Sequence, residues 1–375
     1  MKIAVLGAGM VGRAIAEDLA QVFEVTSFDK SRESLAVLAQ RAPAVKTKPF
    51  DLSAKGSYGA LLKPFDMVVT AVPGFMGFGV LKRVIEAGKN VVDISFSPED
   101  VLSLDALAKK NKVTAIVDCG VAPGMSNLVL GRYDREMKIH NFECYVGGLP
   151  KIRKKPFEYK APFSPVDVIE EYTRPARLME NGKVVTKPAL TEIELMDFNG
   201  VGTLEAFNTD GLRSILYTMA HIPNMKEKTL RYPGHCELIT ALQRSGFFSN
   251  SSISCKGVDI SPMEFTSAVL FNEWKLQPGE EEFTVMKIIV QGEQKGKRKT
   301  VEYSLLDHYD TTSQTTSMAR ATGYTCTAAV QLIAGNLFPA AGVFPPESIG
   351  KDKACFDRII RHLKERKVNW EKKEY

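Results

Sequence analysis

Asp93, Ser95 and Asp118 are placed where this chain could do acid–base chemistry. Each comes at or just after the end of an apolar run, within NVVDISF and VTAIVDCG. Open α/β sheets bind ligands at the carboxyl ends of their strands, so position alone makes these three residues site candidates. Two aspartates that lie close together can share a proton, which raises the pKa of one of them. Either aspartate could instead cap the helix that follows its strand.

A glycine-rich turn at the start of the sequence, MKIAVLGAGMVGRAIAEDL, predicts where an anionic cofactor would bind. Gly7, Gly9 and Gly12 stand between a short apolar strand and a helical segment that begins near Met10, which is the context that a dinucleotide fingerprint requires. Gly7 permits the tight turn, Gly9 lets the backbone approach a pyrophosphate, and Gly12 lets the helix pack closely on the strand. The pyrophosphate would then accept hydrogen bonds from the N-terminus of that helix.

Asp29 strengthens this prediction because it ends the strand FEVTSFD, about twenty residues beyond the glycines, where a carboxylate accepts from a ribose hydroxyl. Its charge would repel a 2′-phosphate, which favours NAD, whereas Lys30 and Arg32 nearby keep NADP open. Asp29 could also be an ordinary turn residue at a strand end. The residues expected to bind the cofactor are Gly7, Gly9, Met10, Val11, Gly12, Asp29, Lys30, Val72, Pro73 and Gly74.

The order of the segments predicts an α/β fold with a Rossmann, doubly wound parallel sheet. Further apolar strands are expected in the segments 66–77, which breaks at Pro73-Gly74, 90–96 and 113–118. Helical patterns separate these strands, as a parallel sheet requires.

A different pattern follows residue 126 and predicts a second, α+β domain with a mixed, largely antiparallel sheet. Its strands are expected at 142–150, 190–198, 202–208, 283–293 and 299–307, and its helices at Pro165–Tyr172, Glu237–Gly246 and Pro262–Trp274. Two helices, Ser317–Leu337 and Glu347–Arg366, should return to the first domain. We therefore expect 1–125 and 311–375 to form the NAD-binding domain, and 126–310 to form an inserted substrate and oligomerisation domain.

The composition limits the classes of partner. The 375 residues include 49 basic and 44 acidic residues, a net charge of +5, which is compatible with small acidic ligands and does not require nucleic acid. The basic runs 151–155 and 295–299 are expected in loops. Six scattered cysteines lack metal-ligand spacing, so we expect no metal. With a first strand from Lys2 and no apolar run of about 20 residues, we expect a cytoplasmic protein without a membrane segment.

Several sequence blocks together resemble the saccharopine dehydrogenase family, most closely its short lysine 6-dehydrogenase branch. These blocks are VLGAGMVGRAIA, VVDISF, DCGVAPGMSN, VGGLP, EEYTRPAR, NTDGLRS, TLRYPGH and SMARATGYT, and they cover nearly the whole chain in the family's order. GGLP, EEYTRPAR and LRYPGH are the specific ones. One departure is the segment Ala122–Ser126, because saccharopine reductases usually carry an Asp-Pro-Gly-Ile-Asp type segment there.

The resemblance implies an oxidation of L-lysine by NAD. Its products would be ammonia, NADH and 2-aminoadipate 6-semialdehyde, which closes to piperideine-6-carboxylate. The reacting amine must be neutral when hydride leaves its carbon, and a free lysine amine has a pKa of about 10.4. A base near that amine is therefore required.

Under this resemblance, Asp93 and Asp118 are the first candidates to hold and deprotonate the amine. His235 is the alternative base, since the pKa of a histidine is about 6.5, although a lone histidine is more often structural. A substrate carboxylate calls for arginine, and Arg174, Arg213 and Arg231 each lie in a family block. Glu170 could instead pair with Arg174 along a helix, and Asp210 with Arg213. The full set expected to contact the substrate is Ser95, Tyr172, Arg174, Asp210, Arg213 and Arg231.

Two other functions stay open. A saccharopine-type reductase would join an amine to an aldehyde or keto acid, and would need a second arginine for the additional carboxylates. A sensor that binds NAD without catalysis would keep the fold, but it would not need polar residues at successive strand ends. A homodimer or a larger homo-oligomer is expected by default.

Overall fold

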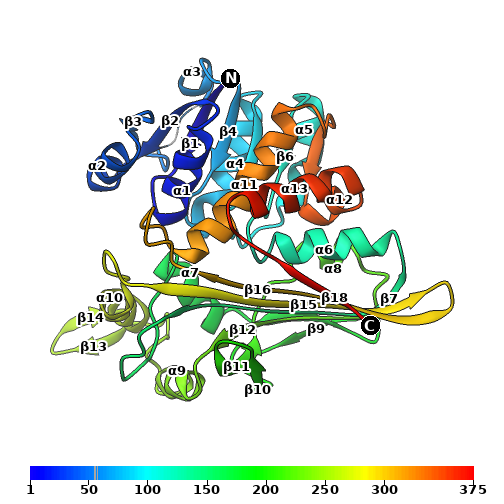
Figure 1. Cartoon of the computed structure of the whole chain (residues 1–375). Helices are drawn as coiled ribbons and strands as arrows, with labels where there is room; N and C mark the ends of the chain where they lie inside the picture. Colours follow the sequence, from blue (N-terminus) through cyan, green and yellow to red (C-terminus); the bar gives the residue numbers. More distant parts are fainter. Residues whose placement is uncertain (55, 57) are drawn as a thin grey trace.

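The computed structural model describes residues 1–54, 56 and 58–375. In this part of the chain two large sheets lie one above the other. The elements up to α6 (Met125–Asp134) lie in the upper layer together with the C-terminal helices α11 to α13, within 317–365 (Figure 1). The upper layer holds a seven-stranded sheet and the lower layer a nine-stranded sheet, and the chain passes between them more than once. A two-stranded hairpin is separate from both sheets.

The seven-stranded sheet is parallel throughout and has the order β17-β6-β5-β4-β1-β2-β3. Its strands are β1 (Lys2–Leu6), β2 (Glu24–Asp29), β3 (Lys46–Pro49), β4 (Met67–Thr70), β5 (Asn90–Asp93), β6 (Thr114–Ile116) and β17 (Gly342–Phe344). The order reverses on either side of β1, as in a Rossmann fold, and the crevice at that reversal is where such sheets bind ligands. The predicted fold class is confirmed.

Helices cover both faces of this sheet. Successive side chains of a strand point to opposite faces, and from Ile3 to Leu6 of β1 both sets are apolar and buried. On β1, Ile3 and Val5 join the same core as α1 and α11, whereas Ala4 and Leu6 join the core with α4. The helices of this part are α1 (Met10–Leu19), α2 (Arg32–Arg41), α3 (Gly59–Leu62), α4 (Gly74–Glu86), η1 (Val101–Leu104), α5 (Asp105–Lys110), α6 (Met125–Asp134) and α11 (Ser317–Ala334).

The nine-stranded sheet is mixed. Its main path is β10-β11-β12-β7-β15-β16-β18, with β8 and β9 attached at β12. β12 runs parallel to β7 and the other neighbours are antiparallel. Its strands are β7 (Lys138–Pro150), β8 (Ala176–Glu180), β9 (Lys183–Lys187), β10 (Glu194–Phe198), β11 (Gly202–Asn208), β12 (Asn224–Arg231), β15 (Glu282–Gln294), β16 (Lys297–His308) and β18 (Glu371–Glu374).

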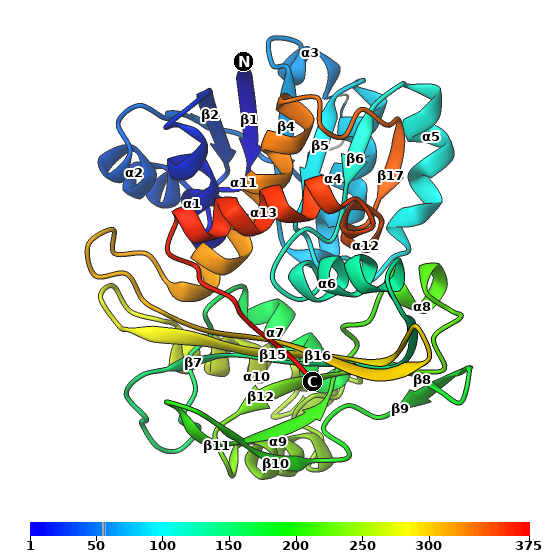
Figure 2. The same ribbon diagram turned by 45° about the vertical axis from the view of Figure 1, so that its right-hand side comes forward.

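Of the remaining elements of the second part, α9 and α10 lie below this sheet, whereas α8 lies above it beside α6 (Figures 1 and 2). The helices α7, α9 and α10 share an apolar core around Trp274, and the long pair β15–β16 forms the predicted hairpin. These elements are α7 (Pro165–Thr173), α8 (Ile215–Thr218), α9 (His235–Arg244), α10 (Pro262–Trp274), and the strands β13 (Ile253–Cys255) and β14 (Val258–Ile260).

The C-terminal part of the chain contacts both layers. Instead of one helix over 347–366, the chain forms α12 (Pro346–Gly350) and α13 (Lys353–Glu365). The break follows from Asp352, whose carboxylate accepts hydrogen bonds from the backbone N–H groups of Ala354 and Cys355 and so starts a new helix. β17 then belongs to the first sheet and β18 to the second, so the boundaries proposed at 125 and 310 stay a prediction. Within the described residues, no helix is long and apolar enough to cross a membrane.

Candidate active site

A cavity of about 330 Å³ lies where the glycine-rich turn of the first sheet meets α7 and β12 of the second part. From the first part it is lined by Gly9 to Gly12, by residues at the carboxyl ends of β4 and β5, and by the segment 120–123. From the second part it is lined by side chains of α7 and β12, with Met318 and Thr322 of α11 on another side. The cavity therefore adjoins the edge at which a Rossmann sheet binds its cofactor.

The glycine-rich turn has the geometry that the fingerprint predicts. Gly7 has a φ of +114°, and a Cβ there would stand 2.2 Å from the carbonyl oxygen of Ala71. A Cβ on Gly12 would stand 2.2 Å from the carbonyl oxygen of Gly7. A Cβ on Gly9 would meet no described atom within 4 Å, so this residue leaves open space beside the N-terminus of α1. A dinucleotide pyrophosphate fits these residues.

Of the other predicted cofactor residues, Met10, Val11, Val72 and Pro73 also line the cavity. Gly74 begins α4 directly beside it, where its N–H donates to Asp167. Lys30 is exposed at the end of β2.

Asp29 bridges two turns at the end of β2. Its Oδ2 accepts a hydrogen bond from the backbone N–H of Ala8 at 2.7 Å, and its Oδ1 accepts one from Ser31 at 2.8 Å. The carboxylate therefore holds the glycine-rich turn next to the strand end. This is the position from which it would meet the adenosine ribose of a dinucleotide.

Asp93 and Ser95 do not belong to the cavity lining, contrary to our expectation. Asp93 is fully buried, and its Oδ1 accepts hydrogen bonds from the hydroxyls of Thr70 and Ser95. The chain is extended here, so alternate residues face opposite sides, and Ile94 and Phe96 line the cavity instead. Burial is the main cause that raises the pKa of Asp93 to about 7, yet the carboxyl does not reach the cavity.

Asp118 is paired with Arg213, so it does not form a proton-sharing pair with Asp93. The Nε of Arg213 donates to both carboxylate oxygens of Asp118, at 3.0 and 3.1 Å, and Nη1 donates to the carbonyl of Ser97 at 2.6 Å. Both charged side chains are buried. The guanidinium also lies over the ring of Phe96, at 4.8 Å from its centroid. Arg213 and Asp118 thus support the cavity wall from behind and lie outside its lining.

Arg231 lines the cavity, but its charge is already neutralised. Its Nη2 donates to Glu171 at 2.6 Å and its Nε donates to the hydroxyl of Tyr172 at 3.0 Å. Tyr172 contacts Nε2 of His235 at 3.0 Å, and Nδ1 of His235 lies 2.9 Å from the carbonyl of Phe157. Because a carbonyl can only accept, Nδ1 donates to it, Nε2 accepts from Tyr172, and the imidazole is neutral.

His235 and Tyr172 therefore lie behind the cavity wall, among aromatic rings that include Trp274. Burial is the main cause that lowers the pKa of His235 to about 3, and the charge of Arg231 is the second cause. This environment disfavours the base role that the sequence suggested for His235.

The two remaining predicted substrate residues, Asp210 and Arg174, line the cavity, and both are paired. Arg177 binds Asp210 with two side-chain hydrogen bonds, at 2.9 and 2.8 Å. Arg174 pairs with Glu170 one helical turn away, which was the alternative that the sequence left open.

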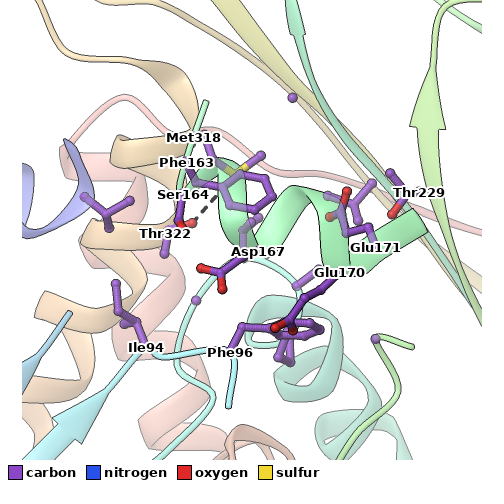
Figure 3. Close-up of a pocket in the computed structure, with 18 of the residues that line it drawn as sticks. Ile94, Phe96, Phe163, Ser164, Asp167, Glu170, Glu171, Thr229, Met318 and Thr322 are labelled. Carbon is purple, nitrogen blue, oxygen red and sulfur yellow. Dashed lines mark hydrogen bonds between the residues drawn. The ribbon is translucent and has the colours of Figure 1, made fainter. Parts of the chain in front are cut away.

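Sequence reasoning missed the carboxyl groups that dominate the lining. Asp167, Glu170, Glu171 and Arg174 follow one another at the helical spacing i, i+3, i+4 and i+7, which places them on one face of α7. Figure 3 shows Asp167 and Glu170 pointing from α7 toward the side of Ile94 and Phe96, and Glu171 on the side of Thr229. This spacing was the available signal.

A second polar set comes from β12. Glu227, Thr229 and Arg231 alternate along the strand and all line the cavity, because residues two apart in a strand share a face. Glu227 and Thr229 stand opposite Cys144 and Val146 of β7, which belong to the core shared with the first sheet. This face of β12 therefore points toward the first sheet.

The lining has an excess of acidic groups. It includes Asp167, Glu170, Glu171, Asp210 and Glu227, against the two basic residues Arg174 and Arg231. Burial raises the pKa of Asp167 to about 6 and is the main cause of an upward shift at Glu171 and Glu227. A cationic ligand would favour the ionised form of these carboxyls. Among the described residues, no group of three or more His, Cys, Asp or Glu side chains could hold a metal.

Comparisons with known proteins place both parts of the chain in one family. Residues 3–116 match the family model described as the saccharopine dehydrogenase NADP binding domain, and residues 120–368 match the saccharopine dehydrogenase C-terminal domain. The solved apo saccharopine dehydrogenase (L-Glu forming) from Saccharomyces cerevisiae superposes with a TM-score of 0.80 at 19% identity, covering 100% of this chain and 99% of that one. That likeness shows a shared fold.

Curated relatives are distant in sequence. Saccharopine dehydrogenase [NADP(+), L-glutamate-forming] of Schizosaccharomyces pombe is 22% identical over 442 residues, covering 97% of each chain. The mitochondrial alpha-aminoadipic semialdehyde synthase of Bos taurus is 24% identical over 280 residues, which cover 70% of this chain and 30% of that protein. Since the two family models together cover most of the chain, from residue 3 to residue 368, this chain belongs to the saccharopine dehydrogenase family.

Proposed function

We propose that this protein is a dinucleotide-dependent oxidoreductase that deaminates the ε-amine of L-lysine or a similar amino acid, releasing ammonia. The observation that supports it most is the lining of the cavity: five carboxyl side chains against two arginines, next to a glycine-rich turn. Carboxylates attract an ammonium group and can remove its proton. The bound dinucleotide would supply the hydride acceptor.

Asp167 is the residue that we propose as the base. It lies at the start of α7, where its Oδ1 accepts a hydrogen bond from the N–H of Gly74 at 3.2 Å. Gly74 begins α4, after the short turn that follows β4, at the edge where the first sheet would hold its cofactor. The carboxylate would take a proton from the substrate ammonium, leaving the neutral amine whose carbon can lose hydride. A pKa of about 6 suits this transfer near neutral pH.

The overall reaction balances with one water molecule. The ammonium would lose a proton to Asp167, and its carbon would give up hydride to the dinucleotide. Water would then add to the iminium, and the nitrogen would leave with the proton so released, as ammonium. That loss leaves the aldehyde, which would close on its own α-amine. Ile94, Phe96 and Met318 on the lining supply apolar surface for a methylene chain.

We propose NAD as the cofactor, with NADP as the alternative. The carboxylate of Asp29, fixed by Ala8 and Ser31, would repel a 2′-phosphate and accept from a ribose hydroxyl. The names of the relatives and of the family model point to NADP, so both dinucleotides belong in the assay.

A saccharopine-type reaction is the second candidate, favoured by the names of the curated relatives. Such a substrate bears additional carboxylates, which call for arginine. In the described lining, Arg174 and Arg231 are both paired with glutamates, and Arg213 is paired with Asp118 outside it. A saccharopine complex would have to break at least one of these pairs.

The test is an assay of the purified protein with NAD and L-lysine at alkaline pH, following NADH at 340 nm and ammonia separately. NADP and saccharopine form parallel arms. NADH and ammonia from lysine would support the proposal, and turnover of saccharopine alone would move the protein to the second candidate. Binding of dinucleotide without any turnover would favour a sensor. Light scattering on the same sample would test the expected homodimer.

A further inference from the structure

Glu227 is a buried carboxyl group that the proposed reaction does not yet use. Its side chain lines the cavity and is only 5% exposed. Within the described residues its Oε2 has no hydrogen-bond partner. Burial raises its pKa well above the usual value, the charges of Glu171 and Asp210 raise it further, and a hydrogen bond from Thr209 opposes them. Thr209 binds the carboxyl, but its Oε2 remains unsatisfied among the described residues. A buried polar atom without a partner is costly, so its position calls for a reason.

The surroundings of Glu227 leave room for this carboxyl and add polar groups beside it. An ideal Cβ on Gly211 would stand 1.5 Å from Oε2 of Glu227, so the carboxyl lies where any other residue would place its side chain. Thr209 and Thr229 line the cavity nearby, with their hydroxyls 3.0 Å apart. Glu171 lines it from α7. These groups come from three separate elements and meet at the second-sheet end of the cavity.

This end is distinct from the end at which the proposed chemistry takes place. Asp167 binds Gly74 of the first part, whereas Glu227, Thr229 and Arg231 project from β12 of the second sheet. Arg231 neutralises Glu171 and Arg177 neutralises Asp210, but among the described residues no cation pairs with Glu227. A ligand that reaches from Asp167 to Glu227 would thus bring the missing positive charge with it.

We propose that Glu227, with the hydroxyls of Thr209 and Thr229, binds a second, non-reacting ammonium group of the substrate. This inference rests on the proposed function, because it assumes that the reacting amine lies at the Asp167 end. It assigns the substrate class as molecules with two ammonium groups separated by an apolar chain. The α-ammonium of lysine and the far ammonium of an aliphatic diamine share this chemistry.

Four ligands separate the contributions: L-lysine, 1,5-diaminopentane, 6-aminohexanoate and pentylamine. The first two carry a second ammonium and the last two do not. Calorimetric binding to the full chain, loaded with NADH so that no oxidation occurs, is measured for the unchanged protein and for Glu227→Gln. The amide keeps the size of the side chain and removes its charge. We expect Glu227→Gln to weaken binding of lysine and 1,5-diaminopentane by roughly tenfold to a hundredfold, and to change the other two less than about twofold.

Two further variants test whether the loss of binding comes from the carboxyl of Glu227. Gly211→Ala should displace the carboxyl of Glu227 and reproduce the same selective loss, because the added methyl group overlaps it. Glu143→Gln is the matched control. Glu143 precedes Cys144 on β7, and Cys144 stands opposite Glu227 of β12. The side chain of Glu143 therefore points to the other face of the sheet. Glu227→Gln should also leave the melting temperature unchanged or higher, because it removes a buried acidic group whose Oε2 has no hydrogen-bond partner among the described residues.

Each outcome decides something. Equal weakening of all four ligands, or no change with lysine and 1,5-diaminopentane, would overturn the ammonium site even if lysine is oxidised. A selective loss in Glu227→Gln without any oxidation of lysine by the unchanged protein would support the site and overturn the proposed reaction. Failure of all four ligands to bind the unchanged protein would overturn both.

Discussion

Gly9 and Gly12 belong to one turn but limit the chain in different ways. A methyl group on Gly9 would meet open space, whereas one on Gly12 would collide with the carbonyl of Gly7 at 2.2 Å. We therefore expect Gly9→Ala to keep the melting temperature and to weaken dinucleotide binding, because it fills the space that a pyrophosphate would use. Gly12→Ala should lower the melting temperature as well. Titration with NADH and thermal unfolding check both, and unchanged affinity in Gly9→Ala would place the pyrophosphate elsewhere.

Asp167 should determine how activity depends on pH. Burial raises its pKa in the folded protein from 3.8 to about 6, and only the ionised form can accept a proton from the substrate. Turnover should therefore be lost as the pH falls through about 6, roughly tenfold per unit. Asp167→Asn should lower kcat by about 100-fold to 10,000-fold, with KM for lysine changed much less. A pH profile of kcat that keeps its acidic limb in the residual activity of Asp167→Asn would assign the base to another residue.

At the scale of elements, the pair Asp118–Arg213 joins the loop after β6 of the first sheet to the segment before α8 in the second part. Both residues have a left-handed φ, of 52° and 49°, and both are buried. Removing one partner leaves the other charge buried and unpaired, which typically costs about 3–5 kcal/mol. We expect Arg213→Met to destabilise the protein by that order.

The matching double variant makes this prediction specific. Adding Asp118→Asn to Arg213→Met removes the orphaned charge and should recover part of the lost free energy of unfolding. Urea titrations of the single and double variants measure this coupling. Purely additive losses would mean that the ion pair does not join the two parts.

The sequence predicted elements better than it predicted the cavity lining. The period of apolar residues and the glycine spacing predicted the turn at Gly7–Gly12 and five strands of the first sheet, but not the edge strands β3 and β17. Asp93 and Ser95 were expected at the site from their place at a strand end, but Ile94 and Phe96 of the same segment line the cavity. Nothing local shows which face of an extended segment points inward. Partners far apart in sequence, such as Glu171 with Arg231, could not be paired without the tertiary fold.

The carboxyl stripe of α7 is a different case. Its spacing was visible in the sequence, and Glu170 was recognised as a possible partner of Arg174. What the sequence did not show is that this polar face turns toward the first sheet, while Val168, Ile169 and Tyr172 pack into the core below. A polar helix face more often meets solvent, and the orientation follows only from how α7 packs.

At the scale of the whole molecule, the two proposed ligands would contact different parts of the chain. The glycine-rich turn belongs to the first sheet and Glu227 of β12 to the second, and both line the cavity. The two layers lie against each other (Figures 1 and 2). Asp167 connects the two layers. It lies on α7 in the second part, and its carboxylate accepts a hydrogen bond from the N–H of Gly74 in the first part. Binding at one layer should therefore favour the arrangement that binds at the other.

We accordingly expect NADH and lysine, a pair that cannot react, to stabilise the protein together by more than the sum of their separate effects. A ligand at 100 times its Kd raises the free energy of unfolding by about 2.7 kcal/mol, and any excess measures the coupling, which must be the same in either order of addition. Melting temperatures at fixed ligand concentrations, with 6-aminohexanoate as the matched amine, give this excess directly. Asp167→Asn should reduce it, because the amide is a weaker acceptor for Gly74 and does not balance the ammonium. Strictly additive shifts in the unchanged protein would mean that the two layers bind their ligands independently.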